Sequence, residues 1–495
     1  MMLKAGAVAR SNMGGTPMPR LVAVLIALAS AGVAWGEIPV MFPAGDAKNV
    51  CVDTPLRLTF AGKPKVGVGE VKIVDANGDK VVDTIDVAQA KRVIAIGGVG
   101  NFSVLPVIVT GNTAAIYPVH GALAYGHRYY VTMDAGTFTD AEGTEFPAIG
   151  KGAWEFSTKG AAPAFPPAGG KVTVAADGTG DFATVQGAID FVPDGNKTPV
   201  TLFVRAGTYD EINVMVQKND VTLLGEDRKK TIIEYPNNAK FNSNENANPY
   251  ANGANPTTRR MGNVYHRGMF LAHRCNDLTI ANLTLHNTTP QGGSQAEALI
   301  LNGTANAHAI VANCDLYSYQ DTVQINGQAY VTGCHIEGDV DFIWGTGPCF
   351  FEKCDIVALR KNAYYTQIRN PATHHGYVFK DCTFEGAEGV TGNMLARIEP
   401  TRFPGSEVVL IDCTLTDAVS PVAWRIERAT EAPEVHFWEY NSHDASGKPV
   451  DTSQRLGVGK VLTQEKDAET IKNYSDPKWV LGGEWEPAVP AEVKE

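Results

Sequence analysis

Short stretches in which apolar and polar residues alternate recur through the second half of the chain. Five of these stretches begin next to a cysteine, and they centre on Cys314, Cys334, Cys354, Cys382 and Cys413. The spacings between these cysteines are 20, 20, 28 and 31 residues. Leu278–Leu285 has the same alternation without a cysteine. A period in the low twenties with variable insertions is typical of a solenoid. We therefore predict a right-handed parallel β-helix over about residues 171–430.

The cysteines are expected to form an inward-facing ladder along this β-helix. Buried thiols behave as small apolar side chains, and we favour this interpretation over disulfide bonds, which remain an alternative. None of the five cysteines forms a C-x-x-C pair, so a zinc site is not expected.

Residues 37–158 have a different pattern of apolar and polar residues. Five short alternating stretches are separated by Gly, Asn and Asp turns: Val71–Val74, Val107–Val109, Ala114–Ile116, Arg128–Thr132 and Trp154–Phe156. This pattern predicts a small β-sandwich. Residues 159–170 are rich in Pro, Gly and Ala and are expected to form a stiff linker. The second domain is then 171–495, and the predicted fold class is all-β.

The first 36 residues have the three parts of a secretory signal. Basic residues Lys4, Arg10 and Arg20 precede the apolar run Leu21–Ala31, and small residues at 34 and 36 mark a cleavage site after Gly36. A buried core helix is the alternative. The run is too short to span a bilayer, and no other stretch is long and apolar enough. We expect a secreted or periplasmic protein without a membrane span.

The net charge of the chain limits the kinds of binding partner that are expected. The chain of 495 residues carries 54 acidic and 42 basic side chains, a formal net charge of −12. This balance argues against a broad nucleic-acid or anionic-membrane footprint. A polyanionic ligand would have to be met by local positive charge.

Two aspartates share one position in the repeat. Asp321 lies seven residues after Cys314, and Asp341 lies seven residues after Cys334. If these cysteines are equivalent in successive coils, the aspartates stack about 4.8 Å apart. Two close carboxylates raise one pKa, whereas a guanidinium lowers the other. A pair divided in this way suits a general acid and a nucleophile.

At these residues the sequence resembles the pectinesterase (pectin methylesterase) family. The motifs appear in the family's order: Gly207–Glu211, Gln295–Ala298, Gln320–Thr322, Gly338–Gly345, Leu395–Arg397, Phe437–Asn441 and Gly483–Trp485. Residues 37–158 resemble bacterial Ig-like domains, with an early Val-Asp-Thr-Pro and a closing Trp-x-Phe-x-Thr.

The resemblance implies a role for each matching side chain. Asp341 would be the nucleophile, and Asp321 would protonate departing methanol and then activate water. Gln295 and Gln320 would donate to the oxyanion, and Arg397 would keep Asp341 ionised. The implied activity is hydrolysis of pectin methyl esters, without a metal or organic cofactor.

Four further residues are predicted to contact the polysaccharide: Tyr209, Phe270, Trp344 and Arg267. For Arg267, a solvated surface arginine is the alternative. No nucleic-acid partner is expected, and the protein is expected to be a monomer.

Two features depart from the family pattern. Glu399 stands where the family usually has a substrate-contacting tryptophan, and an Asn-rich insertion covers about residues 236–263. Both leave open an aspartyl esterase that acts on another ester or a thioester. A non-catalytic polysaccharide-binding protein is a further alternative. A pectate-lyase-like protein would need an acidic calcium cluster, which the sequence does not display.

Overall fold

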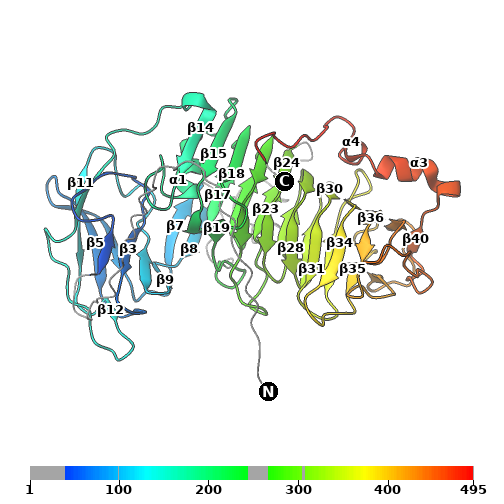
Figure 1. Ribbon diagram of the computed structural model, residues 1–495, viewed down its shortest axis with the longest axis horizontal. Helices are drawn as coiled ribbons and strands as arrows, with labels where there is room; N and C mark the ends of the chain where they lie inside the picture. Colours follow the sequence, from blue (N-terminus) through cyan, green and yellow to red (C-terminus); the bar gives the residue numbers. More distant parts are fainter. Residues whose placement is uncertain (1–38, 98–99, 243–265, 304–306, 494–495) are drawn as a thin grey trace, which may run out of the picture.

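The computed structural model describes residues 39–97, 100–242, 266–303 and 307–493. The predicted signal peptide, 1–36, and most of the predicted insertion lie outside these ranges. A β-sandwich and a long solenoid follow one another along the longest axis of the molecule (Figure 1). Within the described ranges, no helix has the length and apolar character needed to cross a membrane.

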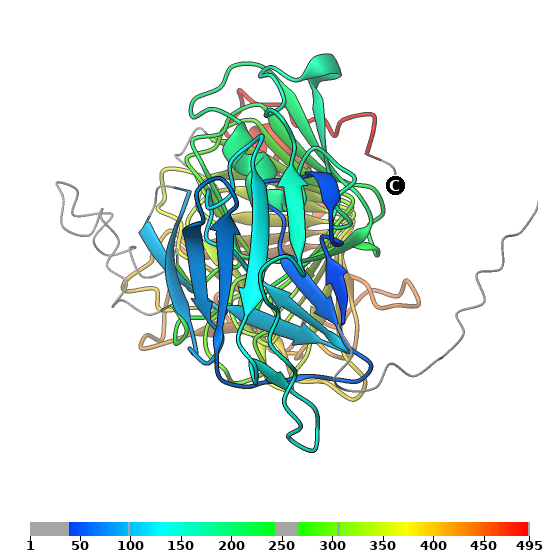
Figure 2. The same cartoon turned by 90° about the vertical axis from the view of Figure 1, so that its left-hand side faces the viewer.

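The N-terminal domain is a sandwich of two main sheets, seen end-on in Figure 2. One sheet has the order β1 (Val40–Phe42), β3 (Leu56–Thr59), β10 (Thr113–Ile116) and β9 (Val107–Thr110). The other has the order β2 (Ala47–Val50), β13 (Glu155–Thr158), β11 (Arg128–Met133), β5 (Glu70–Asp75) and β6 (Lys80–Asp86). A small pair joins β12 (Phe138–Thr139) and β4 (Lys65–Val66). All five predicted strand regions fall in these sheets.

The interior of the sandwich is apolar and contains the predicted tryptophan. Leu58, Ile73 and Val131 are fully buried between the sheets. The Trp154 indole is also buried, and its Nε1 donates to the Pro43 carbonyl oxygen at 2.8 Å. Its polar atom is therefore satisfied inside the core.

The solenoid is a parallel β-helix of three sheets. The first sheet contains β14 (Lys171–Val174), β15 (Val200–Val204), β18 (Val221–Gly225), β21 (Leu278–Ala281), β24 (His308–Ala312), β27 (Gln328–Thr332), β30 (Cys349–Glu352), β33 (Tyr377–Lys380), β36 (Glu407–Ile411), β39 (His436–Tyr440) and β40 (Gly459–Val461). The second sheet contains β16 (Gly207–Asp210), β19 (Thr231–Glu234), β22 (Thr284–His286), β25 (Asp315–Tyr317), β28 (His335–Gly338), β31 (Asp355–Ala358), β34 (Thr383–Gly386) and β37 (Thr414–Leu415). The third sheet contains β17 (Asn213–Val216), β20 (Phe270–His273), β23 (Leu299–Asn302), β26 (Val323–Ile325), β29 (Val340–Gly345), β32 (Tyr364–Ile368), β35 (Met394–Ile398) and β38 (Trp424–Ile426).

A single residue in the left-handed conformation turns the chain from the first sheet into the second. It precedes each ladder cysteine and has a φ between 51° and 61° at Asn313, Gly333, Lys353, Asp381 and Asp412. In the cysteine-free copy, Asn282 has a φ of 56° and divides the predicted single strand into β21 and β22. The repeat is therefore a strand, a one-residue bend and a second strand.

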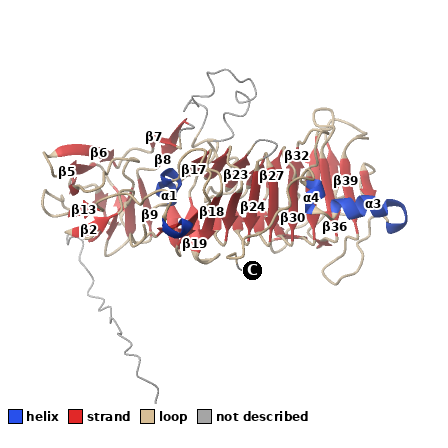
Figure 3. Ribbon diagram, turned by 90° about the horizontal axis from the view of Figure 1, so that it is seen from above, coloured by secondary structure: helices blue, strands red, loops and turns tan. Residues whose placement is uncertain are grey.

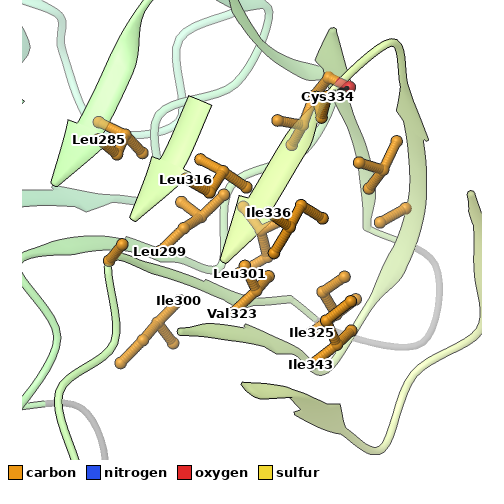
Figure 4. Packing of buried hydrophobic residues seen from close by; sticks show 14 of the residues in the cluster. Leu285, Leu299, Ile300, Leu301, Leu316, Val323, Ile325, Cys334, Ile336 and Ile343 are labelled. Carbon is orange, nitrogen blue, oxygen red and sulfur yellow. Dashed lines mark hydrogen bonds between the residues drawn. The ribbon is translucent and has the colours of Figure 1, made fainter. Parts of the chain in front are cut away.

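The ladder cysteines point inward, as predicted. All eight cysteines of the chain are buried free thiols. The Cys314 N–H donates to Cys334 Sγ at 3.4 Å, and the Cys354 N–H donates to Cys382 Sγ at the same distance. Figure 4 shows neighbouring rows of aliphatic side chains, with Leu285, Leu316 and Ile336 from successive coils.

The solenoid extends beyond the predicted end near residue 430. Strands β39 and β40 continue the first sheet. Helices α3 (Gln464–Tyr474) and α4 (Pro477–Val480) then lie against the outer face of that sheet, beside β30 and β36 (Figure 3). Tyr474, Val480 and Leu481 are buried there against apolar side chains of the first sheet. The C-terminal segment thus covers a face that would otherwise be exposed.

The N-terminal end of the solenoid is closed by α1 (Val185–Phe191) and by a hairpin of the first domain. The η1 turn (Ala168–Gly170) leads into β14, and α1 packs on β14, β15 and β17. The hairpin consists of β7 (Arg92–Ile96) and β8 (Gly100–Val104), and Ile96 and Phe102 belong to the solenoid core. The two domains therefore share a core, in addition to the linker predicted at 159–170.

Glu407 connects helix α3 to the first sheet. Its carboxylate is hydrogen-bonded to His375 Nδ1 at 2.9 Å and to His436 Nδ1 at 2.8 Å, and it accepts from the Tyr474 hydroxyl at 2.6 Å. Burial alone would raise the pKa of Glu407, but these hydrogen bonds lower it to about 2. The stabilisation is complete above the pKa of an unfolded glutamate and is lost as the pH falls toward 2.

Glu407→Gln should make the free energy of unfolding less dependent on pH between about 5 and 2. The wild type should lose roughly 3 kcal/mol more than the variant across this window, because only the wild type must protonate this carboxylate. Chemical denaturation at several pH values measures the difference. Glu465→Gln, at the exposed start of α3, is the control and should follow the wild type. Parallel pH curves for wild type and Glu407→Gln would contradict this account.

Candidate active site

Asp321 and Asp341 occupy equivalent positions in successive coils, where the chain enters the third sheet. Gln320 pairs with Val340 in parallel register, and the Asp321 N–H donates to the Val340 carbonyl oxygen at 3.1 Å. Both aspartates have left-handed backbones, with φ of 65° and 48°. The stacking predicted from the cysteine spacing is present.

The backbone bend before Asp341 requires a glycine. A Cβ on Gly338 would lie 2.1 Å from the Cβ of Phe342, so a larger residue would displace the strand. Phe342 is fully buried. The close contact between Gly338 and Phe342 fixes the start of β29, and Asp341 is the second residue of that strand.

Asp341 is held by a bidentate ion pair with Arg397. Arg397 Nε donates to Asp341 Oδ1 at 2.7 Å, and Nη2 donates to Oδ2 at 2.5 Å. The guanidinium lies 4.5 Å from the centre of the Tyr364 ring and also contacts Glu427 at 3.2 Å. Burial raises the pKa of Asp341 above its usual value, and the hydrogen bonds from Arg397 oppose this rise without reversing it. The hydrogen bonds to Asp341 also raise the pKa of Arg397. The bidentate contact with Arg397 makes Asp341 the better stabilised anion of the two aspartates.

Among the described residues, Asp321 forms an ion pair with one cation, Arg267. Arg267 also pairs with a second carboxylate, that of Glu297. Arg267 Nη2 donates to Asp321 Oδ2 at 2.8 Å, while Arg267 Nε donates to both oxygens of Glu297 at 2.8 and 3.0 Å. The Glu297 side chain is completely buried. One guanidinium neutralises one carboxylate, and the fuller contact with Glu297 assigns the negative charge to Glu297. Asp321 then keeps its proton.

The electrostatic surroundings of Asp321 agree with this division. Burial raises the pKa of Asp321 well above its usual range, and the charges of Glu297 and Asp341 add to the rise. Arg267 and Arg369 act in the opposite direction. The two stacked aspartates therefore have different surroundings, an arrangement that suits one proton donor and one anion.

The two predicted oxyanion donors lie on neighbouring coils beside this pair. The Ala296 N–H, next to Gln295, donates to the Gln320 carbonyl oxygen at 3.1 Å. Both glutamine side chains are half-buried, and Gln295 Oε1 accepts from the Ser294 hydroxyl at 3.0 Å. Their location suits donation to a developing oxyanion, and this role stays a prediction.

Two guanidinium groups lie near the Trp344 ring. Arg267 is 5.3 Å and Arg369 is 5.2 Å from the ring centre. Arg369 also lies 5.6 Å from the Phe403 ring and donates to Gln367. Across the described ranges Arg369 makes no ion pair with a carboxylate. The structure therefore places the predicted contacts Trp344 and Arg267 at the site and adds Arg369.

Tyr209 and Phe270, predicted as substrate contacts, lie elsewhere. The Tyr209 hydroxyl accepts from the Ala176 N–H at 3.2 Å and donates to the Arg205 carbonyl oxygen at 3.0 Å, in the first coils. Phe270 is fully buried in the solenoid core, in register with Leu299. Its side chain faces inward because strand residues alternate between the two faces. Both are structural residues.

Comparison with known proteins decides the family. The sequence model described as Pectinesterase matches residues 171–483, and the one described as Bacterial Ig-like domain matches 37–158. The chain belongs to the pectinesterase family. Arabidopsis thaliana pectinesterase 31 is 32% identical over 313 residues, covering 62% of this chain and 92% of that protein. Pectinesterase/pectinesterase inhibitor U1 of Solanum lycopersicum is 27% identical over 332 residues, covering 63% and 51%. The chain thus spans about half the length of several curated relatives.

Solved structures of pectin methylesterases share the fold of the solenoid. The carrot protein aligns with a TM-score of 0.51 at 23% identity, covering 63% of this chain and 93% of the other. The Erwinia chrysanthemi protein aligns with a TM-score of 0.50 at 20% identity, covering 65% and 98%. The parallel β-helix is therefore common to this chain and these pectin methylesterases.

Glu399 departs from the pectinesterase pattern, but its charge is neutralised locally. Its carboxylate lies 3.2 Å from Arg428 and 3.6 Å from Arg402. The Glu399 side chain is mostly buried, whereas both arginines are exposed. The face that a substrate would meet is therefore cationic at this position rather than anionic.

Asp321→Asn should stabilise the protein at neutral and alkaline pH. The folded wild type retains a proton that the unfolded chain loses above about pH 4, so its free energy of unfolding falls as the pH rises. Asparagine has no such proton. The variant should gain about 1.4 kcal/mol relative to wild type per pH unit above 4, until Asp321 ionises in the folded state. Chemical denaturation between pH 4 and 8 measures this gain.

Asp315→Asn is the matched control. Asp315 is also a buried aspartate of the solenoid, but it pairs with Arg228 at 2.7 Å and with Lys229 at 2.6 Å. Its replacement leaves two cations without their partner and should destabilise the protein. A loss of stability at pH 8 in Asp321→Asn as large as in this control would contradict a protonated Asp321.

Proposed function

We propose that this protein is a secreted pectinesterase that hydrolyses methyl esters of polygalacturonate to free carboxylates and methanol. The observation that carries the proposal is the division of labour between the stacked aspartates. Asp341 is an anion on a bidentate arginine, and Asp321, one coil away, is a buried acid that shares Arg267 with Glu297. Membership of the pectinesterase family supports the same chemistry.

The first half of the reaction forms an acyl-enzyme. An Asp341 carboxylate oxygen attacks the ester carbonyl carbon, and the carbonyl electron pair moves to its oxygen, where the amides of Gln295 and Gln320 donate hydrogen bonds. When the tetrahedral intermediate collapses, the bond to methoxide breaks. Asp321 gives its proton to this oxygen, and methanol leaves.

The second half restores the enzyme. Asp321, now a carboxylate, takes a proton from water as the water oxygen attacks the acyl carbon of the anhydride. Collapse releases the uronate and returns Asp341 as an anion beside Arg397. Asp321 is protonated again, so no net proton stays on the enzyme. The proton of the new uronic acid passes to solvent.

The arginines around the site supply the local positive charge that the acidic chain otherwise lacks. Arg369 stacks on Trp344 without a carboxylate partner in the described part of the chain, and Arg402 and Arg428 cover Glu399. A guanidinium held on aromatic faces suits both a sugar ring and a neighbouring uronate carboxylate. These contacts support pectin as the substrate. We further propose export through the 1–36 signal and action as a monomer.

Asp341→Asn should abolish methanol release from highly esterified pectin. Loss of the nucleophile should lower kcat by at least about a thousandfold, because no other group forms the acyl-enzyme. Methanol is measured enzymatically with purified mature protein at several degrees of esterification. Asp355→Asn, an exposed aspartate at the start of β31 in the next coil, is the control and should retain the wild-type rate.

Three results would count against the proposal. Equal rates for wild type and Asp341→Asn would exclude the aspartyl mechanism. Preference for a different ester or a thioester in a substrate panel would exclude pectin as the substrate. Binding of pectin with no release of methanol by the wild type would favour a non-catalytic role.

A further inference from the structure

Buried asparagines hold the main chain on both sides of Arg267. The Nδ2 of Asn237 donates to the carbonyl oxygens of His266 and Gly268 at 2.8 and 2.7 Å, and these are the residues before and after Arg267. Asn237 is fully buried. It therefore fixes the main chain from which the arginine side chain extends.

This contact continues into the N-terminal domain. The Nδ2 of Asn242 donates to Asn237 Oδ1 at 2.8 Å and to the Ser103 carbonyl oxygen at 3.0 Å, and Asn242 Oδ1 accepts from the Ser103 N–H at 2.6 Å. Ser103 lies in β8, in the hairpin of the Ig-like domain. Two buried amides thus connect a strand of one domain to the arginine-bearing segment of the other.

An aromatic contact joins the same two segments. The ring of Phe102, also in β8, lies 4.7 Å from the ring of His266, the residue before Arg267. Phe102 is fully buried, and His266 is almost so. Polar and apolar contacts therefore both place the hairpin directly against the start of the segment that carries Arg267.

We propose that hairpin β7–β8 of the Ig-like domain is a positioning element of the active site, which holds Arg267 in place and so completes the ion-pair network around Asp321. The proposal rests on the proposed esterase function and assigns the N-terminal domain a part in that reaction. The domain then does more than tether the enzyme or bind polysaccharide.

The consequence of losing this support follows from the groups that face Asp321. These are Arg267, Glu297, Asp341 and Arg369, from four different coils. Displacement of Arg267 removes a cation and leaves Glu297 without its partner, and both changes raise the pKa of Asp321. The acid would then donate its proton to methanol less readily, so kcat falls while the contacts of Trp344 and Arg369 with the sugar remain.

The test uses Asn242→Ala in the full mature chain. Relative to wild type, kcat for methanol release should fall about tenfold, KM should change little, and the alkaline limb of the pH profile should move up by about half a pH unit or more. Arg267→Gln should shift the limb in the same direction. Glu297→Gln, which leaves Arg267 to Asp321 alone, should shift it to lower pH.

Asp53→Ala is the matched control for a disturbed domain contact. The Asp53 carboxylate accepts from the Ala183 N–H at 3.0 Å and from the Thr184 N–H at 2.8 Å, at the start of α1. It joins the same two domains without touching the segment of Arg267. Asp53→Ala should lower the melting temperature but leave the pH limb in place.

A second measurement does not depend on substrate. The stability that Asp321→Asn gains over its parent rises with pH and levels off where Asp321 ionises in the folded protein. This levelling pH should be higher in an Asn242→Ala background than in wild type, because the pKa of Asp321 is higher there. The same levelling pH in both backgrounds, or the same limb shift in Asp53→Ala and Asn242→Ala, would overturn the proposal. Absence of esterase activity in wild type would refute the function alone, and the stability comparison would still decide whether the hairpin acts on Asp321.

Discussion

The parallel register between coils is the constraint on which the rest of the structure depends. Main-chain hydrogen bonds hold each strand about 4.8 Å from its neighbour, so equivalent side chains must stack. In the interior this stacking produces rows of thiols and aliphatic groups, as at Cys314 and Cys334. On the outer edge of the third sheet it brings Asp321 and Asp341 together. Two carboxylates at that spacing cannot both be anions without cations of their own.

The site resolves this conflict with unequal partners. Asp341 receives two hydrogen bonds from Arg397, whose third contact is with the partly exposed Glu427, whereas Asp321 receives one hydrogen bond from an arginine already engaged by Glu297. Desolvation makes any other distribution of charge costly. The same arrangement that makes the stack tolerable also gives the two aspartates different surroundings, as the proposed acid and nucleophile require.

The repeat and the aspartate pair could be predicted from sequence because both follow from position within a coil. The cysteines mark equivalent positions in successive coils, and the equal offset of Asp321 and Asp341 from their cysteines does not depend on insertions elsewhere. Arg397 came from the family resemblance. The prediction that Phe270 contacts the substrate is wrong, because its position in the strand points the side chain inward. Trp344 occupies the alternate kind of position, whose side chains point outward. One residue of register separates an inward-facing position from an outward-facing one.

Glu297 and Arg369 could not be predicted, because their contacts depend on the paths of loops of variable length. Arg267 was predicted to contact substrate, but its role as a bridge between two carboxylates is visible only in space. The same holds for hairpin β7–β8, whose sequence is typical of a sandwich strand pair. The apolar residues Ile96 and Phe102 fit either core, and only the structure shows that they belong to the solenoid.

The core that the two domains share affects how the first coil of the solenoid forms. A stack of parallel coils has no natural first member, since each coil offers its neighbour the same unpaired edge and open apolar interior. Here the first coils meet α1 and the hairpin, which cover the apolar end of the stack. The Ig-like domain is made first during synthesis, so it presents a template before any coil exists. Assembly can then proceed in one direction from a defined end, which limits misaligned stacking between coils or between molecules.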